Sequence, residues 1–220
     1  MRNNIQISIP NISGNERNYL NKCIDEGYVS SVGRFVNDFE EGLVDKTGIK
    51  YCNVVSSGTN ALLASLITSG VDRDGLVIIP DYTFIATANA VHFAGASPWI
   101  FDIDPKTLNL NIEYVSDVIR KTCKYINSNW VHKSTNKKIS AIIPVFAMGN
   151  YISFEKLNSF YNEFGIPIII DAAGALSTKD IYKEFEILDY ASVIFSFNGN
   201  KIITTGGGGA ILTNNKKLAL

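Results

Sequence analysis

The chain has 220 residues, of which 46% are hydrophobic, and a formal net charge of −1. This length is enough for one sizeable core, or for one domain and part of another. The balanced charge argues against a nucleic-acid partner, and no apolar run reaches the ~20 residues of a membrane span. Three scattered cysteines and two histidines offer neither a CxxC pair nor metal-ligand spacing. We therefore expect a cytoplasmic protein that holds no metal.

The N-terminal part of the chain predicts two helices before any strand. Residues 11–26 begin with polar residues that suit a helix cap, and a helical pattern follows them. Residues 33–43 place Phe35, Val36 and Phe39 at helical spacing, so a second helix follows the first.

Seven apolar runs predict the strands of a single sheet. They are continuously apolar rather than alternating, which is typical of strands covered on both faces. Helical segments of 10–15 residues alternate with the runs, as in βαβ units. We therefore expect an α/β fold with a mostly parallel seven-stranded sheet and helices on both faces. The predicted strands are residues 51–55, 76–80, 97–103, 139–146, 166–171, 191–197 and 208–214.

Two further stretches bear on the organisation of the chain. Residues 121–138 are polar and rich in lysine, and we expect a solvated loop there. The final residues, ILTNNKKLAL, stop as a charged helix begins, without a Gly or Pro stop signal. We therefore expect residues 1–220 to be part of a longer protein.

The residues that follow the predicted strands are the candidates for chemistry, because ligands of α/β sheets bind beyond the carboxyl ends of the strands. After the first strand comes SSGTN (56–60) and then an apolar helix. The N–H groups of a helix N-terminus suit a phosphate, and the Thr59 hydroxyl adds a donor. Ser and Thr are also ordinary helix caps, which is the alternative here. A dinucleotide-binding loop would need G-x-G-x-x-G, which SSGTNA lacks.

An aromatic residue and a carboxylate follow two other strands. Phe84 comes shortly after residues 76–80, where it either stacks on a flat ring in the cleft or lies in the core. Asp171 ends residues 166–171, where a buried carboxylate is costly without a partner. It either pairs with a cationic ring nitrogen or caps the next helix.

Lys201 lies in the segment SFNGNKIITTGGGG (196–209), shortly after the sixth predicted strand. A phosphate-binding P-loop needs its glycines before the lysine, whereas here they follow it, so that interpretation fails. A lysine held in a cleft can act as a Schiff-base nucleophile, and an exposed surface charge is the alternative. The glycines suit a tight backbone passage near a ligand.

Taken together, these strand-end features match one kind of site. A helix-end phosphate site, a stacking aromatic ring, a carboxylate for a pyridinium nitrogen and a nucleophilic lysine are the parts that a pyridoxal phosphate site needs. The sequence therefore predicts pyridoxal 5′-phosphate as the cofactor.

Six segments resemble, in the same order, the DegT/DnrJ/StrS family of sugar aminotransferases, which are fold-type I pyridoxal phosphate enzymes. The last segment is the most specific. It is most similar to the branch that aminates the 4-keto group of UDP-linked 4-keto-6-deoxy sugars, on the way to bacillosamine- or legionaminic-type sugars of bacterial surface glycans. The segments are VSSVGRFVNDFE, SSGTNALLASL, DYTFIATANAV, GASPWIFDID, IIIDAAGAL and SFNGNKIITTGGGGAILTN.

The resemblance implies a role for each matching residue. Lys201 would hold the cofactor covalently, Asp171 would keep the pyridine nitrogen protonated, and Phe84 would stack on the ring. Family members usually carry Gln, Glu or His three residues after the aspartate, where this chain has Gly174. The phosphate ligands would be Thr59, the backbone at Asn60, and Ser196.

The resemblance implies that residues 1–220 form the large cofactor-binding domain, with a small C-terminal domain outside this chain. It also implies the reaction and the partners. Glutamate would give its amino group through the cofactor to a keto-sugar nucleotide and leave as 2-oxoglutarate, in a homodimer with the active site at the interface. Some relatives are 3-dehydratases of deoxysugars that carry His in place of the lysine, so Lys201 favours transamination. An inactive remnant without catalysis is the alternative of another class.

Overall fold

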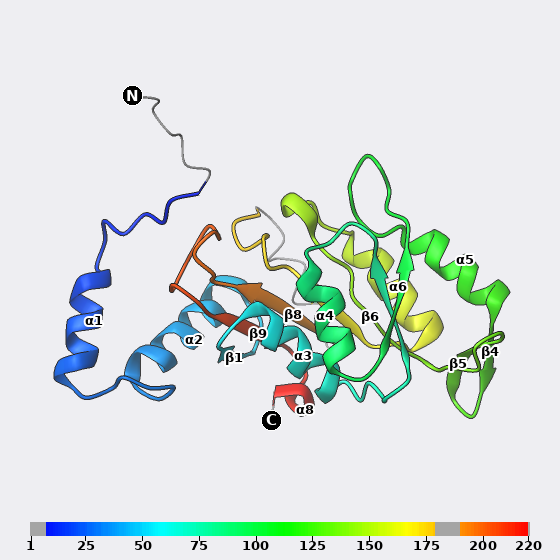
Figure 1. The fold of residues 1–220 in the computed structure, drawn as a ribbon, viewed down its shortest axis with the longest axis horizontal. Coiled ribbons are helices and arrows are strands. Elements are labelled where there is room, and N and C mark those ends of the chain that lie inside the picture. The colour runs from blue at the N-terminus through cyan, green and yellow to red at the C-terminus, as the bar shows by residue number, and fades with distance from the viewer. Residues whose placement is uncertain (1–7, 179–189, 220) are drawn as a thin grey trace.

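The computed structural model describes residues 8–178 and 190–219. Its main element is a seven-stranded sheet with the strand order β1-β9-β8-β7-β6-β2-β3 (Figure 1). Five of the six strand pairings join strands that are either far apart in the sequence or connected by a crossover. This is the connectivity of an α/β fold. The predicted fold class is confirmed.

The sheet is mostly parallel because only β9 runs against its neighbours. It pairs antiparallel with β1 on one side and with β8 on the other, while the remaining pairs are parallel. The strands are β1 (Tyr51–Val55), β2 (Leu76–Pro80), β3 (Ser97–Phe101), β6 (Ile139–Ile142), β7 (Ile168–Asp171), β8 (Ala191–Ser196) and β9 (Gly209–Thr213).

Helices cover both faces of the sheet, and alternate residues of each strand supply the two cores. In β2, Val77 and Ile79 pack with α3 and α4, whereas Leu76 and Ile78 belong to the core formed with α2, α5 and α6. Burial on both faces explains why the strands are apolar without alternation.

The helices agree with the predicted pattern in the N-terminal part and between the strands. Of the described residues, no helix is both long and apolar enough to span a membrane. The helices are α1 (Glu16–Asp25), α2 (Arg34–Thr47), α3 (Gly58–Thr68), α4 (Ile85–Phe93), α5 (Ile112–Thr122), α6 (Phe154–Phe164), α8 (Lys216–Ala219) and the short 3-10 turn η1 (Ala147–Gly149).

The prediction of a solvated loop over residues 121–138 is wrong. The stretch forms an antiparallel hairpin of β4 (Cys123–Ile126) and β5 (Asn129–His132). Asn127 and Ser128 connect the strands with φ of 47° and 62°, the positive angles of a tight two-residue hairpin turn. Residues 124–126 are all exposed, so the sequence here lacks the apolar run that marks the strands of the main sheet.

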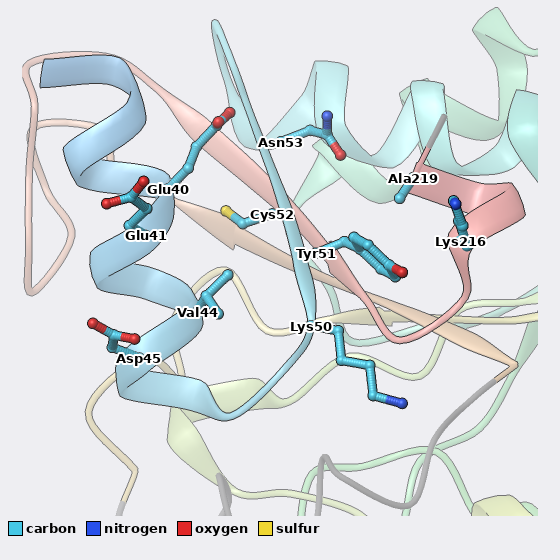
Figure 2. A pocket seen from close by; sticks show the side chains of 10 residues that line it. All are labelled: Glu40, Glu41, Val44, Asp45, Lys50, Tyr51, Cys52, Asn53, Lys216 and Ala219. Atoms are coloured by element: carbon cyan, nitrogen blue, oxygen red, sulfur yellow. The ribbon is translucent and has the colours of Figure 1, made fainter. Parts of the chain in front are cut away.

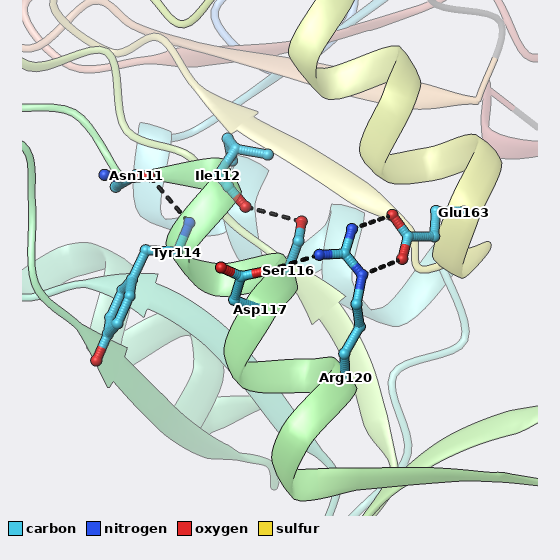
Figure 3. Close-up of polar contacts among 7 residues, drawn as sticks. All are labelled: Asn111, Ile112, Tyr114, Ser116, Asp117, Arg120 and Glu163. Carbon is cyan, nitrogen blue, oxygen red and sulfur yellow. Dashed lines mark hydrogen bonds and ion pairs between the residues drawn. The ribbon is translucent and has the colours of Figure 1, made fainter.

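Helix α5 was not predicted, and polar contacts define both its start and its packing on α6 (Figure 3). The Asn111 side chain caps its N-terminus by accepting a hydrogen bond from the Tyr114 N–H at 3.0 Å. Arg120 donates to both carboxylate oxygens of Glu163 on α6, each at 2.7 Å, and also pairs with Asp117. Since these side chains are largely exposed to solvent, the pairs add little to stability.

Candidate active site

The carboxyl edge of the sheet brings the candidate residues together. β7 ends at Asp171 and the adjacent β8 ends at Ser196, in a register that pairs Asp171 with Ile194. Lys201 lies in the connection from β8 to β9, half-buried, with its backbone N–H donating to the Asn198 carbonyl at 2.9 Å. These polar side chains therefore lie at or beyond the carboxyl ends of the strands, where the sequence predicts them.

The N-terminus of α3 lies directly against Ser196 and the start of β9. A Cβ atom at Gly58 would lie 3.0 Å from the Ser196 Cβ, and one at Gly209 would lie 2.5 Å from the Ser57 carbonyl carbon. An isolated bridge between Ser57 and Gly208 continues the contact. These glycines let the N-terminus of α3 lie close to Ser196 and to the start of β9, and the N–H groups of a helix N-terminus suit a phosphate group.

Replacing Gly209 with alanine is expected to push α3 away from β9. The added Cβ has backbone atoms of Ser57 and Gly58 within 2.6 Å, so neither neighbour can move aside cheaply. We expect a loss of about 1–3 kcal/mol in the free energy of unfolding, and weaker cofactor binding. Denaturant unfolding measures the first and cofactor titration the second.

The matched control for this substitution is Gly42→Ala on α2. A Cβ at Gly42 meets nothing within 4 Å, and alanine is the better helix former by up to about 1 kcal/mol. The control should therefore be neutral or stabilising. Equal destabilisation by the two substitutions would contradict the close approach of α3 and β9.

The first turn of α3 is capped by a serine, as the alternative interpretation of this segment foresaw. Ser57 is the N-cap, and its Oγ accepts a hydrogen bond from the Asn60 N–H at 3.1 Å. The Asn60 side chain donates to Ser56 Oγ at 2.7 Å. The backbone at Asn60 thus has a partner within the chain, and a phosphate would share that N–H with Ser57. Thr59 lies beside it in the same turn, and its role as a phosphate ligand stays a prediction.

Asp171 is 6% exposed, and each of its carboxylate oxygens accepts one hydrogen bond. Thr87 Oγ1 donates to Oδ2 at 2.8 Å, and the Ala173 N–H donates to Oδ1 at 3.1 Å. Residues 172–178 form turns, so the alternative of a helix cap is wrong. The carboxylate is held in place and retains lone pairs for a further partner.

Burial raises the pKa of Asp171, because a buried charge loses its hydration. The hydrogen bonds from Thr87 and from the Ala173 N–H, and then the charge of Lys201, lower that pKa in part. Lys201 is therefore close enough for its charge to act on Asp171. A cationic ring nitrogen at this carboxylate would lower the pKa further and offset the cost of burial.

The alternative that Phe84 is a core aromatic is wrong. Its side chain is 77% exposed at the N-terminus of α4, where it is free to contact a ligand. Gly174 has nothing within 4 Å of where a Cβ would lie. The position where the resemblance expects Gln, Glu or His is therefore open space beside Asp171.

Sequence reasoning missed Thr87, the residue that contacts Asp171. It is fully buried in α4, and its Oγ1 lies 2.8 Å from that of Thr83. The available signal was two threonines four residues apart at the start of an otherwise apolar helix, which places both on one side of the first turn.

Two hollows lie elsewhere on the molecule. One of about 500 Å³ lies between α2, β1 and α8, where Glu40, Glu41 and Asp45 line it (Figure 2). Cys52, also in its wall, is no nucleophile, because burial and then the charge of Glu40 raise its pKa to about 12. The other lies between α5 and α6. Neither hollow borders the candidate site.

The site fits the cofactor predicted from the sequence. The glycine-lined contact of α3 with Ser196 suits a phosphate, and among residues 8–178 and 190–219 Lys201 supplies the only positive charge that acts on the buried Asp171. Phe84 is exposed at the N-terminus of α4. On an α/β sheet, this set of residues suits a protein that binds pyridoxal phosphate.

Comparison with known proteins identifies the family: the chain belongs to the DegT/DnrJ/EryC1/StrS aminotransferase family, whose profile matches residues 10–220. It is 36% identical over 216 residues to the GDP-perosamine synthase of Caulobacter vibrioides, a match that covers 98% of this chain and 53% of that protein. The chain thus spans about half the length of the curated relatives that it matches.

Solved structures agree with the family assignment. DesI, crystallised in the presence of its TDP-sugar product, matches with a TM-score of 0.79 and 26% identity, over 96% of this chain and 49% of DesI. NtdA from Bacillus subtilis, with the cofactor PMP bound, matches with a TM-score of 0.78 and 26% identity, over 100% of this chain and 48% of NtdA. An Escherichia coli GDP-4-keto-6-deoxy-D-mannose-3-dehydratase, 20% identical, shares the fold.

Proposed function

We propose that this protein catalyses the pyridoxal phosphate-dependent transamination of a keto-sugar nucleotide. One observation carries the proposal: Asp171 is buried, held by Thr87 and Ala173, and lies within reach of the charge of Lys201. When bound, the cofactor supplies an electron sink that stabilises negative charge at the reacting carbon.

The residues of the site have distinct tasks in this reaction. Asp171 holds a proton on the ring nitrogen through its negative charge. Lys201 binds the cofactor through Nζ and, once released, moves the proton at the reacting carbon as general acid and base. Phe84 orients the ring by stacking. The phosphate is bound by Thr59, the backbone at Asn60, and Ser196.

We further propose a UDP-linked 4-keto-6-deoxy-hexose as the acceptor and glutamate as the donor, in the cytoplasmic synthesis of surface-glycan sugars. The segment SFNGNKIITTGGGGAILTN supports this branch. Other nucleotides stand in the names of two similar proteins, a GDP-perosamine synthase and DesI with its TDP-sugar product. The assay therefore compares UDP-, GDP- and TDP-linked 4-keto sugars with glutamate, and we expect 2-oxoglutarate to form fastest with the UDP sugar.

The same assay separates transamination from sugar dehydration. With glutamate present, a dehydratase would remove the 3-hydroxyl of the sugar as water, and the amino group taken from glutamate would leave as ammonia. We expect no ammonia and a sugar product that carries the amino group, because Lys201 stands where the dehydratases of the resemblance carry His. Ammonia release together with a 3-deoxy sugar would reject the transaminase proposal, and so would equal 2-oxoglutarate formation with and without a sugar.

We also propose that two copies of the chain associate. Helix α1 has no buried residue and lies apart from the sheet (Figure 1), with Leu20 and Ile24 64% and 67% exposed. Apolar helix faces of this kind are normally covered. Sedimentation of the protein at micromolar concentration tests for a dimer.

A further inference from the structure

Two threonines form a line that ends on Asp171. Thr83 lies just before α4 and Thr87 lies in its first turn, with their Oγ1 atoms 2.8 Å apart. Thr87 Oγ1 donates to Asp171 Oδ2 at 2.8 Å, and Thr87 is completely buried. The contact joins the segment that carries Phe84 to the end of β7, which lies 84 residues further along the chain.

Counting protons fixes the direction of this line. A threonine hydroxyl carries one proton and can accept with its lone pairs. Thr87 donates its only hydroxyl proton to Asp171, so in its hydrogen bond with Thr83 it must be the acceptor. The Thr83 hydroxyl is therefore the donor. Both protons point toward the carboxylate, as an ionised carboxylate requires.

We propose that Thr83 and Thr87 form a hydroxyl relay that orients the Asp171 carboxylate and keeps it ionised. Thr87 is thereby a positioning residue, acting on the cofactor through Asp171. The proposal rests on the proposed function for the role of Asp171 toward a ring nitrogen, but its first test does not.

The relay has a second arrangement that matches a protonated Asp171. An Asp171 hydroxyl would donate to Thr87, Thr87 would turn to donate to Thr83, and the Thr83 proton would go to the Phe84 carbonyl. That carbonyl oxygen lies 3.3 Å from Thr83 Oγ1 and is available as the last acceptor. Every donor has an acceptor in either arrangement. The two hydroxyls can therefore reverse the direction of their hydrogen bonds when Asp171 gains or loses a proton.

The groups that act on Asp171 come from three elements. Thr87 comes from α4, the Ala173 N–H from the turn after β7, and the Lys201 charge from the connection between β8 and β9. All three favour the ionised form, against the burial that disfavours it. Loss of the Thr87 hydroxyl removes the first of these and leaves the other two in place.

The first test measures the Asp171 carboxyl directly, in cofactor-free protein. The side chain is followed by carbon NMR over a pH series, with the signal assigned by comparison with Asp171→Asn. We expect Thr87→Val, which has the same shape without the hydroxyl, to move the pKa of Asp171 upward. Thr87→Ser keeps the donor and should restore the wild-type titration.

The matched control is Thr213→Val. Thr213 is also buried and donates at 2.8 Å, but to the Ala191 carbonyl at the opposite end of the sheet. It should leave the Asp171 titration unchanged. If Thr87→Val does not fold, Thr83→Val carries the test, with an upward shift expected because Thr87 loses its donor.

The second test uses the cofactor-loaded protein. In Thr87→Val we expect the pH dependence of the near-visible absorption to shift, and kcat to fall roughly tenfold or more, with KM for the sugar nucleotide within about twofold. Thr87→Ser should recover both. If the protein failed to bind the cofactor, the proposed function would be rejected, but the result of the first test would still stand.

Two results would overturn the relay. One is an Asp171 titration that is the same in Thr87→Val and in the wild type. The other is a shift in Thr87→Ser as large as in Thr87→Val, which would make the effect one of packing rather than of the hydroxyl.

Discussion

Lys201→Ala is expected to abolish turnover, with a loss of about 10²–10⁴-fold or more, because the residue is proposed both to hold the cofactor and to move the proton. Steady-state assays with glutamate and the keto-sugar nucleotide measure the loss. The near-visible absorption that depends on the covalent link should disappear at the same time. Cofactor binding through the proposed phosphate ligands, Thr59, the backbone at Asn60 and Ser196, should persist, though more weakly.

The control for this substitution is Lys124→Ala. Lys124 is exposed on β4, outside the carboxyl edge of the sheet. Its replacement should change neither turnover nor absorption. Full transaminase activity in Lys201→Ala would remove the lysine from the mechanism.

Asp171→Asn is expected to lower turnover by about 10²–10³-fold, because the amide keeps the shape of the side chain but not the charge that holds the ring-nitrogen proton. The amide oxygen can still accept from Thr87 or from the Ala173 N–H. Asp45→Asn, on the exposed face of α2, serves as the control. Turnover in Asp171→Asn within twofold of the wild type would contradict the role of the charge.

The same substitution separates stability from catalysis. The folded-state pKa of Asp171 is raised by burial, so its contribution favours folding at low pH and is lost as the pH rises through that pKa. Above that pKa, the buried carboxylate opposes folding in the cofactor-free protein. We expect Asp171→Asn to raise Tm without cofactor and to reduce the gain in Tm when cofactor is added. Thermal unfolding with and without the cofactor measures both.

The pattern of apolar residues within short sequence segments predicted most of the sheet. The runs around Val77, Ile142 and Ile194 are apolar without alternation because helices cover both faces, and that signal is visible in the sequence. The position of Asp171 and Ser196 beyond strand ends follows from the same pattern. The strands β4 and β5 were missed because most of their residues are partly or fully exposed and the flanking lysines give the stretch the composition of a loop.

Other features depend on contacts between residues that are far apart in the sequence. The pattern of a short sequence segment does not indicate such contacts. The insertion of β9 between β1 and β8 brings Gly209 against Ser57, and no local signal indicates that pairing. The hydrogen bond from Thr87 to Asp171 joins residues on different elements. The choice between a core and an exposed Phe84 likewise required the position of α4 on the sheet.

The central claim is that Lys201 holds the cofactor. The measurement that tests it most directly is borohydride reduction of the cofactor-loaded protein, followed by digestion and mass spectrometry of the peptides. We expect one reduced pyridoxyl phosphate group per chain, on the peptide that contains Lys201, and none in Lys201→Ala. A label on another lysine, or an unlabelled Lys201 peptide in protein with bound cofactor, would contradict the account.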